Sequence, residues 1–258
     1  MHSTTGAPPG QGAAIRARGL GVKGPRGWAF RGVDIDAPAG SLVAVEGPSG
    51  SGRTSLLLAL TGRMRTGAGS AEVGGLPLPR QMAAVRRSTA LAHVPGVAEL
   101  DASLTVDEHL HERALLQLRF GGSPLTLLRS RNERAARTKA RIDAAVTAAG
   151  LDVAALPKGG RTTVRELERL AALRLSLALA LIGTPRLIAV DDTDLKLSDA
   201  ERAQAWALLR SLADTGTTVL AVCSEASEGA LVVRTDGAND DTEITKGAAH
   251  AFAETGRA

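Results

Sequence analysis

The chain has 258 residues, 44% of them apolar and 22% charged, which is the composition of a folded globular protein large enough to bury a substantial core. A formal net charge of +4 permits a phosphate-bearing ligand, but aromatic residues amount to only 2% and tyrosine is absent, so we expect no nucleic acid partner. The single cysteine, Cys223, excludes an intrachain disulfide and suits a reducing compartment.

The sequence contains no pattern typical of a membrane span or a signal peptide. No run approaches the ~18 consecutive apolar residues of a transmembrane helix. The first residues, MHSTTGAPPGQGAA, lack the basic start and apolar stretch of a signal peptide. We therefore expect a cytoplasmic protein with a disordered tail over residues 1–13, one folded domain over 14–235 and a polar C-terminal tail over 236–258.

The first half of the folded domain predicts strands around a glycine-rich loop. Residues 14–38 carry scattered Val, Ile and Leu among many glycines, which indicates short strands and turns. The apolar run Leu42–Glu46 predicts a buried strand, and TSLLLALTGRM over residues 54–64 predicts a helix that stops near Gly62. The stretch GPSGSGRTS between them therefore lies in a strand–loop–helix unit.

Residues from about 100 to 182 have a mainly helical pattern. Thr105 stands three residues ahead of Glu108, which is a capping-box pattern that opens a helix through about Phe120. A second helix is predicted over Leu127–Ala149 and a third over Thr163–Ile182. These helices would form an insertion between two parts that contain strands.

Strands return after this insertion. Leu187–Val190 predicts a short buried strand, Ser198–Ala213 a helix, and TTVLAVCSE over residues 217–225 another strand. Strands that alternate with helices indicate an α/β fold with a mostly parallel sheet covered on both faces.

The stretch GPSGSGRTS has the properties of a phosphate-binding loop. Phosphate oxygens are held by several backbone N–H groups that converge at a helix N-terminus, and glycines let the loop approach the anion closely. A hydroxyl at Thr54 would lie where Mg²⁺ binds. The candidate nucleotide-binding residues are Gly47, Pro48, Ser49, Gly50, Ser51, Gly52, Arg53, Thr54 and Ser55.

Arg53 departs from the pattern of such loops, which have lysine at this position. Lysine presents a compact ammonium, whereas guanidinium is planar and wider. Arg53 keeps the positive charge, but it is less suited to the point contact that stabilises charge during phosphoryl transfer. The substitution therefore predicts a smaller loss in binding than in turnover.

Two aspartates follow the strand Leu187–Val190. A carboxylate at the carboxyl end of a central strand is well placed to hold Mg²⁺ opposite the phosphate loop, so Asp191 and Thr54 are the candidate metal residues. Asp192 would then be the candidate catalytic residue that polarises the attacking water.

With these motifs in order, the chain resembles an ATP-binding cassette (ABC) ATPase, the nucleotide-binding subunit of membrane transporters. The resemblance covers about residues 14–235 and rests on VDIDAPAGSLVAVEGPSGSGRTSLLLALTG, LTVDEHL, and LALALIGTPRLIAVDDTD followed by GTTVLAVCSE. It implies a RecA-like P-loop NTPase core, a small antiparallel β lobe and an inserted helical subdomain. It also implies Mg-ATP, a dimer with itself or a homologous subunit, and docking onto a multi-span permease at the inner face of the membrane.

Several positions depart from the family's catalytic pattern. The LSGGQ signature falls on LERLA, Leu167–Ala171, where Arg169 and Leu170 would fill the space that small residues leave for a partner's γ-phosphate. The remaining departures are Gly96 for the glutamine after HVP, Ser224 for the switch histidine, Asp192 for glutamate, and Gly24 for the adenine-stacking aromatic, with Trp28 as a candidate substitute.

These departures lead to two functional hypotheses. The first is a transporter subunit that binds Mg-ATP while hydrolysis is weak or lost. The second is a non-catalytic regulatory or scaffold protein on the same fold. The basic stretch Arg129–Arg141 is interpreted as a solvated helix face or as a contact for lipid headgroups or an acidic partner.

Overall fold

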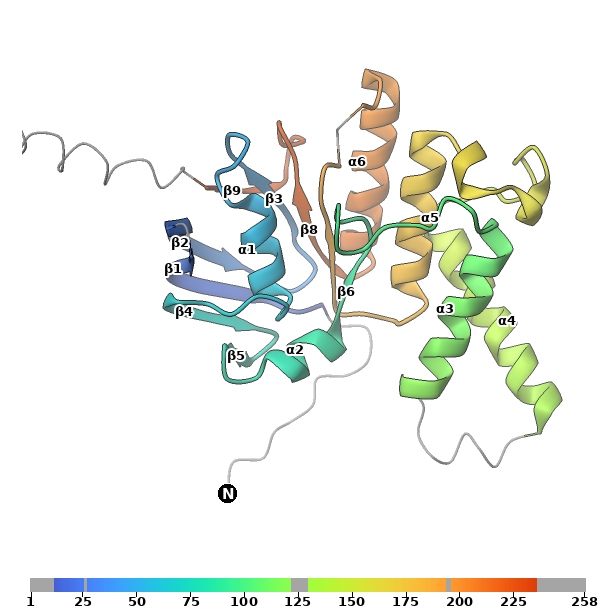
Figure 1. Ribbon diagram of the computed structural model, residues 1–258, viewed down its shortest axis with the longest axis horizontal. Coiled ribbons are helices and arrows are strands. Elements are labelled where there is room, and N and C mark those ends of the chain that lie inside the picture. Colours follow the sequence, from blue (N-terminus) through green and yellow to red (C-terminus); the bar gives the residue numbers. More distant parts are fainter. Residues whose placement is uncertain (1–11, 26, 122–129, 194–195, 236–258) are drawn as a thin grey trace, which may run out of the picture.

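A five-stranded parallel sheet lies at the centre of the protein (Figure 1). The structure is a computed structural model that describes residues 12–25, 27–121, 130–193 and 196–235. The strand order is β6 (Thr89–Leu91), β7 (Leu187–Val190), β8 (Thr218–Val222), β3 (Leu42–Glu46), β9 (Leu231–Arg234), and each neighbouring pair is parallel. Because the strands are parallel, all their carboxyl ends lie at one edge of the sheet.

Both faces of this sheet are covered, as expected. Successive side chains of a strand point to opposite faces. Val43 and Val45 accordingly pack in one apolar cluster with helix α1 (Arg53–Leu60), while Leu42 and Ala44 pack in a second cluster with α5 (Arg169–Leu181) and α6 (Asp199–Asp214). This two-sided burial explains why the central strands are continuous apolar runs in the sequence.

A four-stranded antiparallel sheet packs on the α1 side, in the order β2 (Gly27–Ala37), β1 (Ile15–Gly24), β4 (Ala68–Val73), β5 (Leu76–Leu78). It confirms the expected β lobe, but the prediction of short strands was wrong, since β1 and β2 have 10 and 11 residues. The register of β1 shifts on both sides of Leu20, so bulges absorb the glycines without ending the strand.

The described residues begin at Gly12, two positions before the expected domain boundary at residue 14. Ala13 is buried, and its amide donates to the carbonyl of Arg186 at 3.1 Å. Residues 12 and 13 therefore belong to the folded domain and contact the segments that lead into β7 and β8. The remainder of the expected N-terminal tail and the C-terminal tail lie outside the described residues.

Three helices form the insertion, α3 (Val106–Gly121), α4 (Arg131–Ala148) and α5, which lie together on the side of the sheet away from the β lobe (Figure 1). The capping box that predicted the start of α3 is present: the Thr105 amide donates to the Glu108 carboxylate at 2.8 Å, and the Glu108 amide donates back to the Thr105 hydroxyl at 3.3 Å. A short helix, α2 (Met82–Ser88), precedes β6.

The start of α5 was predicted wrongly. The capping pair Thr163 and Glu166 closes only a 3₁₀ turn, η3 (Val164–Glu166), which follows another such turn, η2 (Gly159–Arg161). Leu167 and Glu168 are then extended, with ψ of 138° and 155°, and the helix begins at Arg169. A capping box therefore marks a local turn here, while packing of Leu167 against the core sets the later start.

Helix α4 begins at Arg131 rather than at Leu127, because Ser130 caps it with Glu133; residues 127–129 lie outside the described residues. Arg134, Arg137 and Lys139 are exposed on this helix, which agrees with the interpretation of the basic stretch as a solvated face. Helix α6 begins at Asp199 after the N-cap residue Ser198. Within the described ranges, no helix combines the length and apolarity needed to cross a membrane.

A buried threonine ties the strand β8 to two segments distant in sequence. The Thr218 hydroxyl donates to the Ala13 carbonyl at 2.9 Å and accepts from the Gly40 amide at 3.0 Å. Thr218 is fully buried, so its replacement by valine would leave both backbone groups without their partner.

We expect Thr218→Val to lower the free energy of unfolding by about 1–3 kcal/mol. The Ala13 carbonyl and the Gly40 amide would stay buried, and would keep the cost of their desolvation, without a hydrogen-bond partner. Thr217→Val is the matched control, since the neighbouring side chain is half-buried and has no hydrogen bond in the described part of the chain. Urea unfolding of both variants checks this. Equal stability of the two variants would contradict the role given to Thr218.

Candidate functional site

The glycine-rich loop joins the carboxyl end of β3 to the N-terminus of α1, as the strand–loop–helix pattern predicted. Gly52 caps the helix with φ of 87°, a left-handed conformation that disfavours residues with a Cβ. A Cβ at Gly52 would also collide with the carbonyl oxygen of Ala29 in β2. The β lobe therefore holds this end of the loop in place by direct backbone contact.

A second anchor of the loop comes from Thr235, which the sequence did not reveal. The Ser51 side chain is buried, and its hydroxyl forms a 2.6 Å hydrogen bond with the Thr235 hydroxyl. The Thr235 amide in turn donates to the carbonyl of Glu46 at 2.9 Å. Ser51 is thus part of the loop's support, while Pro48, Ser49 and Gly50 are exposed.

Free backbone amides converge at the head of α1. The amides of Gly52, Arg53, Thr54 and Ser55 have no hydrogen-bond acceptor in the described part of the chain. The N-terminal amides of a helix are its unsatisfied donors, and the helix dipole adds positive potential there. This geometry fits an anionic ligand such as phosphate.

The two candidate metal residues meet directly. The Thr54 hydroxyl donates to Asp191 Oδ2 at 2.5 Å, and the Asp192 amide donates to Asp191 Oδ1 at 2.9 Å. This places a hydroxyl and a carboxylate beside the loop, and hard oxygen ligands are those that Mg²⁺ prefers. The pair fits a magnesium ion shared with phosphate oxygens.

Asp191 is buried, with 3% of its surface exposed. Burial raises the pKa of its carboxyl group, and the charge of Asp192 adds to this, while the Thr54 hydrogen bond opposes it. A buried carboxylate that is costly to ionise gains a compensating charge when a cation binds. The described residues contain no cluster of three or more His, Cys, Asp or Glu side chains that could hold a metal without such a ligand.

Arg53 does not lie over the loop. Its guanidinium donates to the carbonyl oxygen of Cys223, immediately beyond β8, at 2.8 Å. The longer, fork-shaped side chain thus finds a backbone acceptor on a neighbouring strand. The charge stays within reach of Asp191, and its contribution opposes the rise in the pKa of that carboxyl group.

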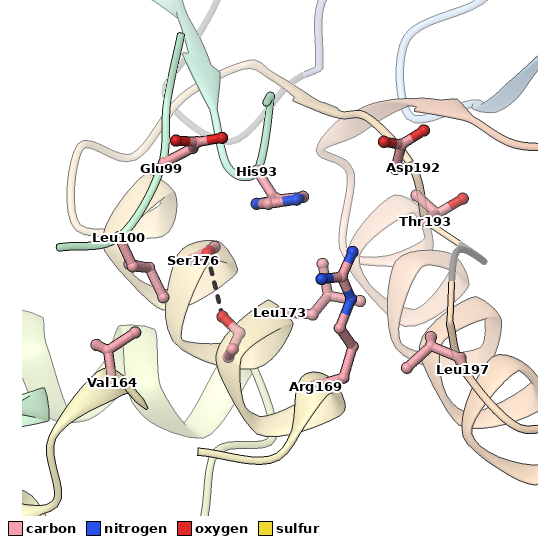
Figure 2. A pocket seen from close by; sticks show the side chains of 11 residues that line it. His93, Glu99, Leu100, Val164, Arg169, Leu173, Ser176, Asp192, Thr193 and Leu197 are labelled. Atoms are coloured by element: carbon pink, nitrogen blue, oxygen red, sulfur yellow. Dashed lines mark hydrogen bonds between the residues drawn. The ribbon is translucent and has the colours of Figure 1, made fainter. Parts of the chain in front are cut away.

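Asp192 has a strained backbone with φ of 50° and lines a cavity of about 230 Å³ between the parallel sheet and α5. Figure 2 shows Arg169 entering the same cavity from α5 and His93 lining it from the loop after β6. Burial, and then the charge of Arg169, lower the pKa of His93, so its imidazole is neutral at pH 7. No sequence pattern had singled out His93.

The expectation that residues of the LERLA stretch fill the space for a partner's γ-phosphate was wrong for Leu170. Leu170 is buried, with 7% of its surface exposed, in the core of its own chain and cannot fill a space offered to a partner. Arg169 points back into the cavity beside Asp192 (Figure 2). Arg169 and Leu170 are successive residues at the head of α5, so their side chains point in different directions.

The structure also locates the other departures. Gly96 lies on the loop after β6, where its amide donates to Glu99 Oε1 at 2.9 Å, and Ser224 is exposed just after β8. Trp28 is the candidate for stacking on a base, and the Lys23 Nζ atom lies 5.7 Å from the centroid of its ring. A cation already covers one face of this indole, so a base could stack only on the other.

Comparisons with known proteins agree with this arrangement. A model of the family described as ABC transporter matches residues 30–194. The daunorubicin resistance ATP-binding protein DrrA3 of Streptomyces coeruleorubidus is 34% identical over 192 residues, which is 74% of this chain but 54% of that protein. The chain therefore spans about half the length of this relative. The Nod factor export ATP-binding protein I of Burkholderia orbicola is 29% identical over 225 residues, covering 87% of this chain and 67% of that protein.

Solved structures show the same fold. The dimeric structure of a bacterial ABC transporter cassette superposes with a TM-score of 0.64, covering 87% of this chain and 96% of that chain. The sequence identity is 19%, so this similarity supports the fold and not the details of the site.

The raised pKa of Asp191 has a consequence for stability. An acid whose pKa is higher in the folded chain than in the unfolded chain binds its proton more tightly in the folded chain. Protonation of this acid therefore stabilises the fold at low pH. That effect is lost as pH rises from the unfolded value of about 4 through the folded value. We expect Asp191→Asn to unfold at a higher temperature than the natural chain at pH 7, because the amide bears no charge and can still bond Thr54 and the Asp192 amide.

Thermal unfolding between about pH 4 and pH 8 measures this difference, which should shrink as the pH falls. Asp214→Asn removes an exposed carboxylate from the end of α6 and serves as the control. An Asp191→Asn variant that is less stable than the natural chain at neutral pH would show that the buried carboxylate stabilises the fold.

Proposed function

Because the chain belongs to the ABC transporter family, we propose that it is the ATP-binding subunit of a membrane transporter, with slow or absent hydrolysis. In this proposal residues 47–55 hold the phosphates of Mg-ATP. The observation that carries it is the 2.5 Å contact between Thr54 and Asp191 beside the free amides at the head of α1. Anion and metal positions are thus adjacent at one sheet edge.

Binding in this proposal uses groups that are all present. The loop amides hold phosphate oxygens, and Thr54 and Asp191 hold the magnesium ion. The bound ion supplies charge neutralisation for the phosphates and a fixed orientation for the terminal phosphate. Arg53 adds a positive charge near the site without a fixed point contact.

Weak turnover follows from the groups that are absent. Asp192 is shorter than glutamate and would have to polarise the attacking water, while Gly96 and Ser224 carry no side chain able to replace glutamine or histidine. The LERLA stretch has Leu170 buried and cannot offer a partner the small, open helix head of the family signature. Each loss removes positioning or electrostatic stabilisation from the transition state.

The proposed partners are a second ATP-binding subunit, identical or homologous, and a multi-span permease. The names of the relatives, daunorubicin resistance and Nod factor export, favour an export system, with the substrate chosen by the permease. The chain would be cytoplasmic and peripheral at the inner face of the membrane. Its domain would span residues 14–235, with the helical subdomain over about 100–182 facing the permease.

The second candidate function is a regulatory or scaffold protein that uses ATP as a structural ligand or not at all. The contact of Arg53 with the Cys223 carbonyl favours it, because this contact stabilises the loop without a nucleotide. The two candidates differ in whether nucleotide binding stabilises the protein and whether a permease co-purifies with it.

The test combines calorimetric binding of Mg-ATP with steady-state hydrolysis, on the natural chain and on Arg53→Lys and Thr54→Val. We expect the natural chain to bind Mg-ATP and to turn over more slowly than about 1 s⁻¹. Arg53→Lys should not restore ordinary rates, because the other departures remain. Thr54→Val should lose the magnesium dependence of binding, since the metal hydroxyl is gone.

Ser49→Ala is the matched control, because this hydroxyl is on the exposed outer side of the loop. Turnover of about 1–10 s⁻¹ by the natural chain, alone or with its partner, would contradict the proposed loss of hydrolysis. Absence of binding, with an unchanged unfolding temperature in millimolar Mg-ATP, would instead favour the scaffold function.

A further inference from the structure

The nucleotide site leaves the basic stretch of α4 unexplained. Arg134, Arg137 and Arg141 stand three and four residues apart, so they form one stripe along the helix. Arg134 and Arg137 are exposed, and Arg141 is half-buried. In the described part of the chain, none of these three side chains forms an ion pair or a hydrogen bond. The arginine stripe is therefore a band of unpaired positive charge within the described structure.

The acidic side chains of α4 are bonded to other groups. Asp143 accepts from Lys139 Nζ at 2.6 Å. Glu133 stands four residues before Arg137, but its carboxylate accepts from the Ser130 amide at 3.0 Å in the capping box of the helix. Neither carboxylate pairs with the arginine stripe.

An exposed leucine pair lies on the neighbouring helix. Leu115 of α3 has 64% of its surface exposed, and Leu116 has 43%. Leu115 and Arg134 line the same groove between α3 and α4, which has a volume of about 670 Å³. Apolar side chains beside basic ones are typical of helices that bind at the boundary between lipid headgroups and acyl chains.

The groove separates its charges along its length. Its carboxylates, Asp107 and Asp143, belong to the first turn of α3 and the C-terminal half of α4. Leu115 and Arg134 lie nearer the opposite helix ends, and Figure 1 shows the end of α3 and the start of α4 together at the lower right, away from both sheets. Apolar and basic groups are thus placed toward one protruding end.

A broad anionic surface fits this arrangement better than a single small anion. The arginine stripe covers seven residues, or about 10 Å of helix, and only Arg134 among its members lines the groove. A compact anion would need several donors that converge on one point. A bilayer surface instead presents charge along the whole stripe and accepts an exposed leucine at its boundary.

We infer that the end of α3 and the start of α4 bind directly to the surface of a bilayer that contains anionic phospholipids. In this arrangement the arginine stripe contacts the headgroup phosphates, and Leu115 enters the boundary of the acyl chains. The inference goes beyond the proposed function, in which the chain reaches the membrane through a permease. It requires neither a bound nucleotide nor a permease.

The test is co-sedimentation of the full chain with vesicles at millimolar lipid. The vesicles consist of phosphatidylcholine alone or of phosphatidylcholine and phosphatidylglycerol in equal parts. The double variant Arg134→Gln/Arg137→Gln removes two charges of the arginine stripe. Arg161→Gln/Arg165→Gln is its matched control, because both arginines are exposed on the 3₁₀ turns η2 and η3.

The apolar contact is tested separately with Leu115→Ser. Val97→Ser is the matched control, since Val97 is 53% exposed and lies on the loop after β6. Thermal unfolding verifies that every variant is folded.

We expect the natural chain to bind the anionic vesicles much more strongly than the neutral ones, and to bind less at high salt, which screens the charges. Arg134→Gln/Arg137→Gln should bind at least about tenfold more weakly, because each arginine near an anionic surface strengthens binding severalfold. Leu115→Ser should lower binding by about fivefold, since it removes the inserted apolar group. Both control variants should bind within about threefold of the natural chain.

Equal losses for the two arginine pairs would overturn the inference, because net charge alone would then explain the binding. Absence of binding to anionic vesicles would overturn it as well, and binding of polyglutamate in their place would point to an acidic protein partner. These results would leave the proposed function intact, since no nucleotide is present in the test. Failure of the natural chain to bind Mg-ATP would in turn leave the vesicle result unchanged.

Discussion

The hydrogen bond between Thr54 and Asp191 is the contact on which the site depends. It joins the first turn of α1 to the residue that follows β7, although 137 positions separate them in the sequence. The contact is possible because β3, β8 and β7 are adjacent parallel strands whose carboxyl ends share one edge. The candidate anion-binding amides and the candidate metal-binding carboxylate are thereby brought together by topology.

The support of this site comes from regions outside the motif. The Ala29 carbonyl fixes Gly52 from the β lobe, and Thr235 fixes Ser51 from beyond β9. These contacts shape the loop before any ligand arrives, which reduces the conformational cost of binding. Arg53 is tied to the Cys223 carbonyl, and Gly96, Asp192 and Ser224 differ from the family's catalytic pattern. These features support the proposal that the chain binds Mg-ATP while hydrolysis is weak or lost.

The sequence was most informative where a local pattern decides the structure. The apolar run before Gly47 and the glycines after it predicted the strand, the loop and α1 because each acts within a few residues. The start of α5 was missed because packing of Leu167 overrode a capping box. The Ser51–Thr235 and Arg53–Cys223 contacts join residues more than 160 positions apart and leave no local signal. The direction of Arg169 depends on the burial of its neighbour and was likewise invisible.

A crystal structure with Mg²⁺ and a non-hydrolysable ATP analogue tests the central claim most directly. The account predicts phosphate density enclosed by the amides of residues 52–55, with a metal ion inserted between the oxygens of Thr54 and Asp191, whose direct hydrogen bond is then broken. A loop that stays empty at millimolar ligand, with the Thr54–Asp191 and Arg53–Cys223 contacts both intact, would contradict it.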